Sequence, residues 1–372
     1  MSDRATARAE TIAAERVAAE ETARPGAKRW HVAVTLAAAV LIVALTYLLP
    51  PFRNYQLATV GAYLCVTAGL TVLTGLNGQL SLGHGALMAT GAYTLALTQN
   101  ALAGRGQWTL AVSTVAAVAV TTVVGAVVGL AAARLRGPYL AGLTLAVAVV
   151  VPSITSTFDK TFNSDQGLSV ALDPPPLALG ATFPYERWQA WLTWTGALLT
   201  MLLLANLIRS RYGRNLKAVR DDETAARLAG INVARTQVLA FVVSAACAGL
   251  GGALFAVLAQ SVSPGAFPLS LSLFLVMAIV IGGLGSLAGA LWGAVLLVAL
   301  PALAHSATDA IDVSPALAQR LEGNLPLAIF GTVLIVVMLA APGGIASLGS
   351  KAKKAGSKAK KPFHRIHRRK GA

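Results

Sequence analysis

The sequence predicts an all-α polytopic membrane protein with about ten transmembrane helices and both termini in the cytoplasm. Of its 372 residues, 56% are hydrophobic and only 12% are charged, and the mean hydropathy is +0.67. Apolar runs repeatedly reach the roughly 18–20 residues that a helix needs to cross a hydrocarbon core about 30 Å thick. This composition excludes an ordinary soluble domain.

The order of the apolar runs gives the expected spans. They lie at residues 31–49, 56–74, 85–103, 108–133, 138–157, 189–208, 236–260, 268–282, 286–303 and 325–341. Cytoplasmic loops carry an excess of Lys and Arg. With the N-terminus inside, the expected cytoplasmic loops contain Arg134, Arg136 and the basic stretch 209–235, whereas the expected outer loops contain few basic residues. Basic charge therefore alternates as this topology requires.

Residues 268–303 allow two interpretations. They form either one long kinked helix or two short helices broken at Gly282-Gly283-Leu284-Gly285. A single helix would place the basic C-terminal tail outside the cytoplasm, against the positive-inside rule. We therefore predict the broken pair.

The chain divides into three parts. Residues 1–30 form a charged cytoplasmic extension without the pattern of a signal peptide, which ends at Pro25-Gly26. Residues 31–345 form the transmembrane domain, and residues 346–372 form a polybasic cytoplasmic tail with ten Lys and Arg and no acid between 351 and 370. The tail is a topology signal, a tether to anionic membrane lipid, or a binder of RNA phosphate. Nucleic acid is not an expected partner of the remainder.

A charged island separates two long apolar runs at Arg209–Arg235, with seven of the 30 basic and three of the 15 acidic residues. We expect one short helix in this loop, with Asp221 as its N-cap, Asp222 and Glu223 in its first turn, and Gly230 just beyond its C-terminus. Such a helix is placed to dock on a soluble partner. The alternative is an ordinary solvated loop helix held by its caps.

Two further stretches are broken by glycines, at Gly75–Gly85 (GLNGQLSLGHG) and at Gly282–Gly293 (GGLGSLAGALWG). Glycines interrupt helices, and the interruption leaves backbone N–H and C=O groups without helical partners. Such groups are tolerated at membrane depth only beside protein or water. The candidate pathway or gate residues are Gly75, Asn77, Gly78, Gln79, Ser81, Gly83, His84, Gly282, Gly283, Gly285 and Ser286. The alternative is close helix packing without ligand contact, most of all for the second stretch.

His84 is a lone histidine among these residues. Such a histidine is usually hydrogen-bonded to a neighbour, and no metal site is expected.

These stretches resemble LivM-like permease subunits of branched-chain amino acid ABC importers. The loop GRNLKAVRDDETAARLAGINV is similar to their cytoplasmic loop, and the two glycine stretches are similar to their GxxGQxSLGHxxxxxxGAY and GGxGSxxGxxxGA patterns. The resemblance covers about residues 55–345. It implies that the loop helix fits a groove on an ATPase subunit, with coupling residues Arg214, Asp221, Glu223, Ala225, Ala226 and Gly230.

The resemblance implies a multi-pass protein of the bacterial cytoplasmic (inner) membrane that moves branched-chain amino acids. Its implied partners are ATPase subunits, which hold the ATP, a second homologous permease and an extracytoplasmic solute-binding protein. This chain would then bind no cofactor and would not be an enzyme. The family interpretation also covers urea, short amides and other small polar solutes.

The positions of the acidic residues weigh against a proton- or sodium-coupled carrier, and the chain has no ATP-binding motif of its own. All 15 acids lie outside the expected spans, whereas proton- and sodium-coupled carriers usually bury carboxylates there. The chain also lacks a G-x-x-x-x-G-K-[ST] phosphate-binding loop. A stand-alone channel or carrier remains the alternative transporter. A membrane-anchored interaction protein that works through its basic tail is the third hypothesis.

Overall fold

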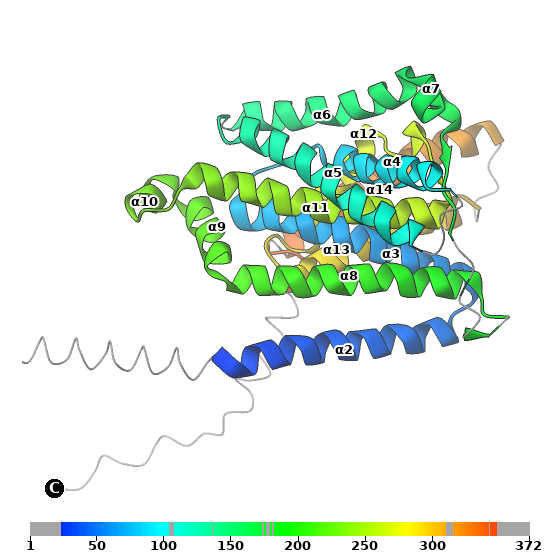
Figure 1. Ribbon diagram of the computed structural model, residues 1–372, viewed down its shortest axis with the longest axis horizontal. Helices are drawn as coiled ribbons and strands as arrows, with labels where there is room; N and C mark the ends of the chain where they lie inside the picture. Colours follow the sequence, from blue (N-terminus) through cyan, green and yellow to red (C-terminus); the bar gives the residue numbers. More distant parts are fainter. Residues whose placement is uncertain are drawn as a thin grey trace, which may run out of the picture.

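The computed structural model is a bundle of long helices that run nearly side by side (Figure 1). It describes residues 24–103, 108–135, 137–172, 175, 179–180, 182–309, 315–341 and 343–347. The predicted tail beyond residue 347 and the extension before residue 24 lie outside the described residues. The helices are α2 (Arg24–Leu48), α3 (Pro51–Leu70), the π-helix η1 (Thr71–Leu76), α4 (His84–Ala101), α5 (Thr109–Ala132), α6 (Pro138–Thr157), α7 (Asp159–Phe162), the 3-10 helix η2 (Ser164–Gln166), α8 (Tyr185–Arg209), α9 (Arg211–Asp221), α10 (Glu223–Leu228), α11 (Val233–Ala259), the 3-10 helix η4 (Pro264–Ala266), α12 (Leu269–Gly282), α13 (Leu287–Asp309) and α14 (Pro315–Ala340).

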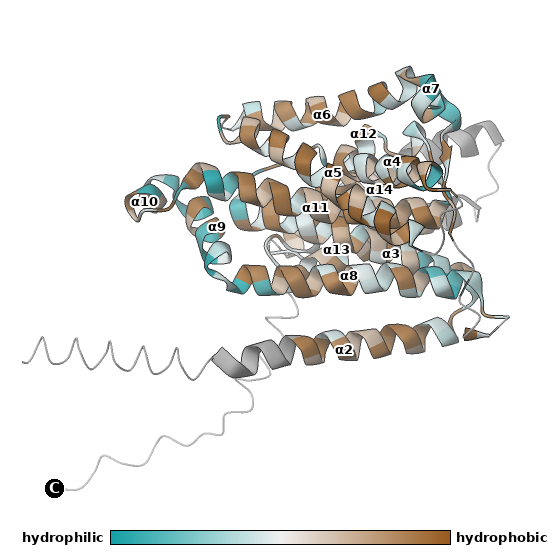
Figure 2. Ribbon diagram, viewed as in Figure 1, coloured by the Kyte–Doolittle hydropathy of each residue, from teal (hydrophilic) through white to brown (hydrophobic). Residues whose placement is uncertain are grey.

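The prediction of an all-α polytopic membrane protein is confirmed. Among the described residues, seven helical segments are long and apolar enough to cross a membrane: Pro51–Leu76, Thr109–Ala132, Tyr139–Thr157, Tyr185–Arg209, Val233–Ala259, Pro264–Gly282 and Ala328–Ser347. Figure 2 shows hydrophobic residues along the middle of the bundle and hydrophilic residues gathered toward its two ends. The other three predicted spans coincide with α2, α4 and α13.

Helix α4 is not among the seven segments that are long and apolar enough to cross a membrane, although it lies inside the bundle. Most of its residues are buried among other helices, so it does not need a lipid-facing apolar surface. Its three threonine hydroxyls are satisfied within the helix, because Thr90, Thr94 and Thr98 each donate to the carbonyl four residues earlier at 2.7–2.9 Å. A helix with several threonines can therefore lie inside this bundle.

Helix α11 is the centre of the bundle and packs against α3, α4 and α5. Small residues let the backbones approach closely. A Cβ atom at Gly249 would lie 2.7 Å from Thr121 Cβ, and one at Gly251 would lie 2.8 Å from the Ala62 carbonyl oxygen. The two cysteines, Cys65 and Cys247, are free and buried here.

The segment 268–303 is a broken pair, as predicted. Helices α12 and α13 are separated by the turn Gly283–Ser286 and pack against each other. Close backbone contact holds the pair, since a Cβ atom at Gly293 would lie 2.7 Å from the carbonyl oxygen of Ala278. Glycine at this crossing therefore serves packing.

The start of the first helix differs from the prediction. The described part of helix α2 runs from Arg24 through Pro25-Gly26, which we expected to end the extension before a span at residue 31. The dipeptide thus lies within this helix instead of preceding it.

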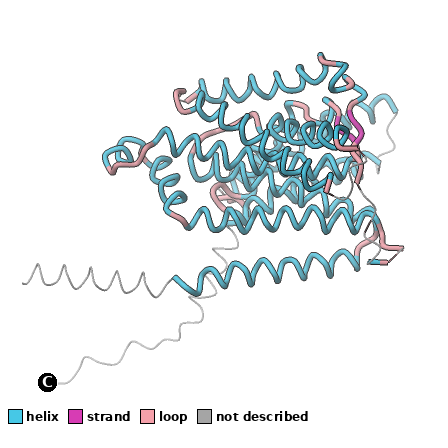
Figure 3. The backbone as a smooth tube through the Cα atoms, viewed as in Figure 1, coloured by secondary structure: helices cyan, strands magenta, loops and turns pink. Residues whose placement is uncertain are grey.

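Two short strands mark one end of the bundle (Figure 3). Strand β1 (Leu168–Ser169) pairs antiparallel with β2 (Ser261–Val262). This pairing joins the long α6–α8 connection to the segment that follows α11. Helices α9 and α10 lie at the opposite end (Figure 1). We call these the strand end and the loop end; the basic residues predict that the loop end is cytoplasmic.

Candidate functional site

The charged island at the loop end folds into two helices, not the single helix predicted. Ser210 caps α9, its hydroxyl accepting from the Tyr212 amide at 3.2 Å. Asp222 caps α10, its carboxylate accepting from the amides of Thr224 and Ala225 at 2.7 and 3.0 Å. The prediction of Asp221 as this cap is wrong. An N-cap needs extended backbone, which Asp222 adopts, whereas Asp221 is the last residue of α9.

The C-terminal end of α10 is closed by Gly230, as predicted. Gly230 has φ +79°, a conformation that glycine adopts without strain. Its amide donates to the Arg227 carbonyl, and the Ile231 amide donates to the Ala226 carbonyl, both at 3.0 Å. This pair of bonds is a Schellman motif. Helix α10 is therefore fixed at both ends.

The two alanines that the sequence placed together lie on different faces of α10. Ala226 is only 3% exposed and packs with Val219 and Val233 in a small core of the loop. Ala225 faces outward, and so does Leu228, which is 87% exposed. Ala226 thus supports the fold of the loop, and Leu228 is a candidate contact that sequence reasoning missed. Its signal was a large apolar residue two positions from a helix-ending glycine.

The charged coupling candidates have distinct partners. Arg214 is exposed on α9. Glu223 accepts a hydrogen bond from Gln237 of α11 at 3.0 Å and lies 3.8 Å from Arg227. Asp221 forms an ion pair with Arg220 at 2.8 Å. Glu223 therefore braces α10 against the bundle, while Arg214 remains at the surface.

The first glycine stretch begins with a π-helix and continues as a helix break. η1 ends at Leu76, and Gly78 has φ +76°. Asn77 and Gln79 are 3% and 6% exposed, yet both polar atoms of the Asn77 amide and the Gln79 Oε1 have no hydrogen-bond partner among the described residues. Buried polar groups normally have partners, including water. The break thus holds buried amide atoms that no described protein group satisfies.

Ser81 and His84 belong to a hydrogen-bonded cluster at the start of α4. The two ring nitrogens of His84 lie 3.0 Å from Ser81 Oγ and 2.6 Å from Ser244 Oγ of α11. The Thr144 hydroxyl accepts from the Leu82 amide at 3.0 Å. A Cβ atom at Gly83 would lie 2.8 Å from the Thr144 carbonyl oxygen. These residues tie the break to α6 and α11, so His84 is hydrogen-bonded to its neighbours, as expected of a lone histidine.

The second glycine stretch contacts the first. Gly283 and Gly285 have φ +122° and +77°, and Ser286 Oγ accepts from the Gly289 amide at 3.4 Å. A Cβ atom at Gly282 would lie 3.0 Å from the Gly293 amide nitrogen, and one at Gly75 would lie 2.7 Å from Gly285 Cα. We call the segments Gly75–Gly83 and Gly282–Ser286 together the glycine junction. Contact between the backbones of η1 and the α12–α13 turn brings α3 and α13 together there.

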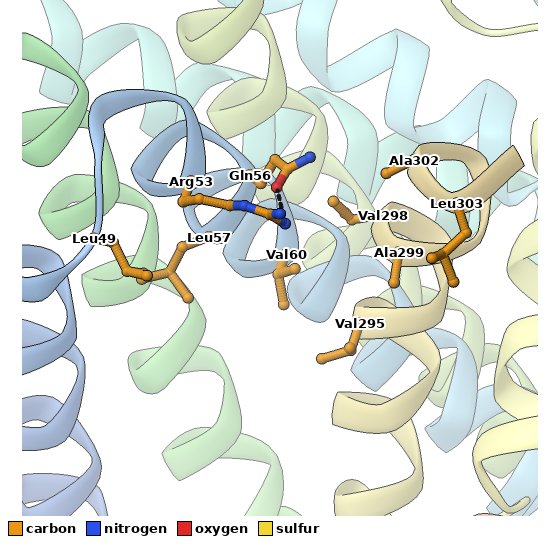
Figure 4. Close-up of a pocket in the computed structure, with 10 residues that line it drawn as sticks. All are labelled: Leu49, Arg53, Gln56, Leu57, Val60, Val295, Val298, Ala299, Ala302 and Leu303. Atoms are coloured by element: carbon orange, nitrogen blue, oxygen red, sulfur yellow. Dashed lines mark hydrogen bonds between the residues drawn. The ribbon is translucent and has the colours of Figure 1, made fainter. Parts of the chain in front are cut away.

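At their opposite ends α3 and α13 separate around a groove of about 380 Å³ (Figure 4). Arg53 reaches into the groove and donates to Gln56 Oε1 at 3.1 Å. The other lining side chains are apolar: Leu49, Leu57, Val60, Val295, Val298, Ala299, Ala302 and Leu303. The same two helices are thus closed at the loop end and parted toward the strand end.

Comparison with known proteins agrees with this architecture. The family model for the permease component of branched-chain amino acid transport systems matches residues 54–342. The chain belongs to this permease family. The resemblance seen in the loop and in the glycine stretches is thereby confirmed. With its apolar helices, this family member is a multi-pass protein of the bacterial inner membrane.

Curated relatives of this permease carry related names. It is 32% identical over 288 residues to the high-affinity branched-chain amino acid transport system permease protein LivM of Salmonella typhimurium, covering 70% of this chain and 66% of the relative. LivM of Escherichia coli K12 is 33% identical over 260 residues, covering 63% and 60%. LivH of Salmonella typhimurium is 28% identical over 297 residues, covering 76% and 90%. The matched region thus spans 60–66% of the two LivM proteins. No solved structure matches.

Proposed function

We propose that this permease is the transmembrane subunit of an ABC importer for branched-chain amino acids. A separate ATPase subunit, which holds the ATP, docks on α10 at the loop end. A second, homologous permease subunit completes the transmembrane pathway. A solute-binding protein delivers the amino acid at the strand end.

The observation that carries this proposal is the outward face of α10. Leu228 is 87% exposed on a helix that is capped by Asp222 and closed by Gly230. A large apolar side chain on a preorganised helix suits a protein partner, because little conformational entropy remains to be lost on docking. Ala225 beside it allows close approach.

The groove between α3 and α13 supports branched-chain amino acids as the substrate class. The Arg53 guanidinium suits a carboxylate, and the apolar wall opposite suits an aliphatic side chain (Figure 4). Urea or a short amide has neither a carboxylate for Arg53 nor a long aliphatic side chain for the apolar wall. The names of the relatives support the same class.

The docking proposal is tested by Leu228→Glu. A charge forced into a protein interface without a partner opposes association strongly. We expect co-purification of the cognate ATPase subunit and ATP-driven uptake of labelled leucine to fall about tenfold or more, which corresponds to about 1.4 kcal/mol. Membrane insertion should be unchanged, because Leu228 lies outside the bundle.

The matched control is Leu179→Glu. Leu179 is also an exposed leucine outside the long helices, 38% exposed, but it lies in the α6–α8 connection on the strand side. It should leave ATPase co-purification unchanged. If Leu228→Glu retains the ATPase as well as Leu179→Glu does, the docking face is not the outward face of α10.

A further inference from the structure

Arg220 joins the loop to the glycine junction directly. It lies in the last turn of α9, and its Nη1 donates to the Gly75 carbonyl oxygen at 2.8 Å. The two residues are 145 positions apart in the sequence. Carbonyls in the last turn of a helix lack an intrahelical donor, and η1 ends one residue after Gly75. Arg220 thus supplies a donor where the break leaves a carbonyl free.

The break is shaped to admit this side chain. A Cβ atom at Gly78 would lie 2.9 Å from Arg220 Cγ, so any larger residue there would press on the arginine stem. Gly78 also has φ +76°. Glycine at this position therefore leaves room for the arginine as well as providing the turn.

The guanidinium is held from its other side by the neighbouring carboxylate. Asp221 Oδ1 accepts from both Nε and Nη2 of Arg220, at 3.0 and 2.8 Å. The two side chains are 40% and 66% exposed, so this ion pair adds little stability in itself. Its effect is orientation, because the planar guanidinium donates to the carboxylate and to the carbonyl in fixed directions.

The contact continues beyond Gly75. Gly75 lies against Gly285, and a Cβ atom at Gly344 would lie 2.6 Å from the Gly283 amide nitrogen. At the other end of the chain of contacts, α9 is packed to α10 through Val219 and Ala226. Displacement of α10 is therefore connected, through α9 and Arg220, to the point where α3 and α13 meet.

We propose that Arg220 is a positioning residue that couples movement of the α9–α10 loop to opening of the glycine junction. The inference rests on the proposed function, since it is the docked ATPase that would move the loop. Arg220 itself touches neither ATP nor solute.

The test compares Arg220→Ala with Lys217→Ala, an exposed basic residue on the same helix. Both are reconstituted with the cognate ATPase and the binding protein. Three quantities are measured: ATPase co-purification, ATP hydrolysis and leucine uptake per ATP hydrolysed. We expect Arg220→Ala to retain the ATPase and hydrolysis but to lower uptake per ATP roughly tenfold, the scale of one lost charge-assisted hydrogen bond. Lys217→Ala should match the wild type in all three.

Two further variants distinguish coupling from simple loss of fold. Arg220→Lys should recover part of the uptake per ATP, because an ammonium can reach the Gly75 carbonyl but cannot bond the carboxylate in the same fork. Gly78→Ala should impair uptake less in the Arg220→Ala background than in the wild type, since the contact with Cγ is then absent. Additive effects of these two substitutions would contradict the contact.

The outcomes separate this inference from the proposed function. If the wild-type permease binds its ATPase and Arg220→Ala transports with normal uptake per ATP, the inference is overturned and the importer stands. If Arg220→Ala loses insertion or ATPase binding together with uptake, Arg220 has a structural role and the inference is also overturned. If the wild-type permease binds no ATPase, the proposed function itself fails.

Discussion

At the scale of the residue, glycine decides how closely the central helices approach. Gly91 of α4 faces Gly249 of α11, and a Cβ atom at Gly91 would lie 2.6 Å from the Gly249 Cα. Without a strong hydrophobic force between helices in lipid, such close backbone packing is a main source of stability. The sequence contained Gly91 within a motif, but its facing residue is 158 positions away and became known only from the fold.

Gly91→Val is therefore expected to destabilise the bundle. The added side chain forces α4 and α11 apart, and overpacking of this kind costs about 1–3 kcal/mol. Thermal stability of the detergent-solubilised protein, followed by size-exclusion chromatography, measures the effect. Gly142→Ala is the control, because a Cβ atom there meets nothing within 4 Å. Equal melting temperatures for the two variants would contradict the packing described for Gly91.

At the scale of the element, hydropathy and turn signals predicted most of the helices but not their faces. The ten apolar runs all correspond to helices, and Gly230 was correctly placed after a helix end. Asp221 and Asp222 could not be separated as caps, because either acid suits an N-cap and only the backbone geometry decides. The burial of Ala226 and the exposure of Leu228 depend on how α10 leans on α9 and α11. The Arg220–Gly75 bond likewise depends on tertiary structure.

Gly230→Pro tests whether the closed end of α10 matters for coupling. Proline fixes φ near −65° and removes the amide that donates to Arg227, so it cannot replace a residue with φ +79°. We expect this substitution to destabilise the end of α10 by more than about 1 kcal/mol, with loss of ATPase co-purification and normal membrane insertion.

Gly230→Asn is the matched substitution, since asparagine tolerates the left-handed region better than other non-glycine residues. It should retain most ATPase binding. Full activity of Gly230→Pro would show that the Schellman motif has no part in docking.

At the scale of the whole molecule, α3 and α13 are held together at one end and lie apart at the other. Backbone contact closes the pair at Gly75 and Gly285, and the groove beside Arg53 parts it toward the strand end. If the loop end is cytoplasmic, as the basic residues predict, the contact between Gly75 and Gly285 lies toward the cytoplasm and the groove lies toward the outside. Under the proposed function, this arrangement suits the state in which an importer receives a solute from a binding protein.

The central claim is that this permease moves aliphatic amino acids inward only when an ATPase subunit drives it. The most direct measurement is uptake of labelled leucine and labelled urea into proteoliposomes that contain the permease, its homologous partner permease and the cognate ATPase, with the binding protein added outside. The account predicts leucine uptake that requires both ATP and the ATPase subunit, with little urea uptake. Leucine uptake at the same rate without the ATPase would contradict it and indicate a stand-alone channel or carrier, and preferential uptake of urea would contradict the proposed substrate.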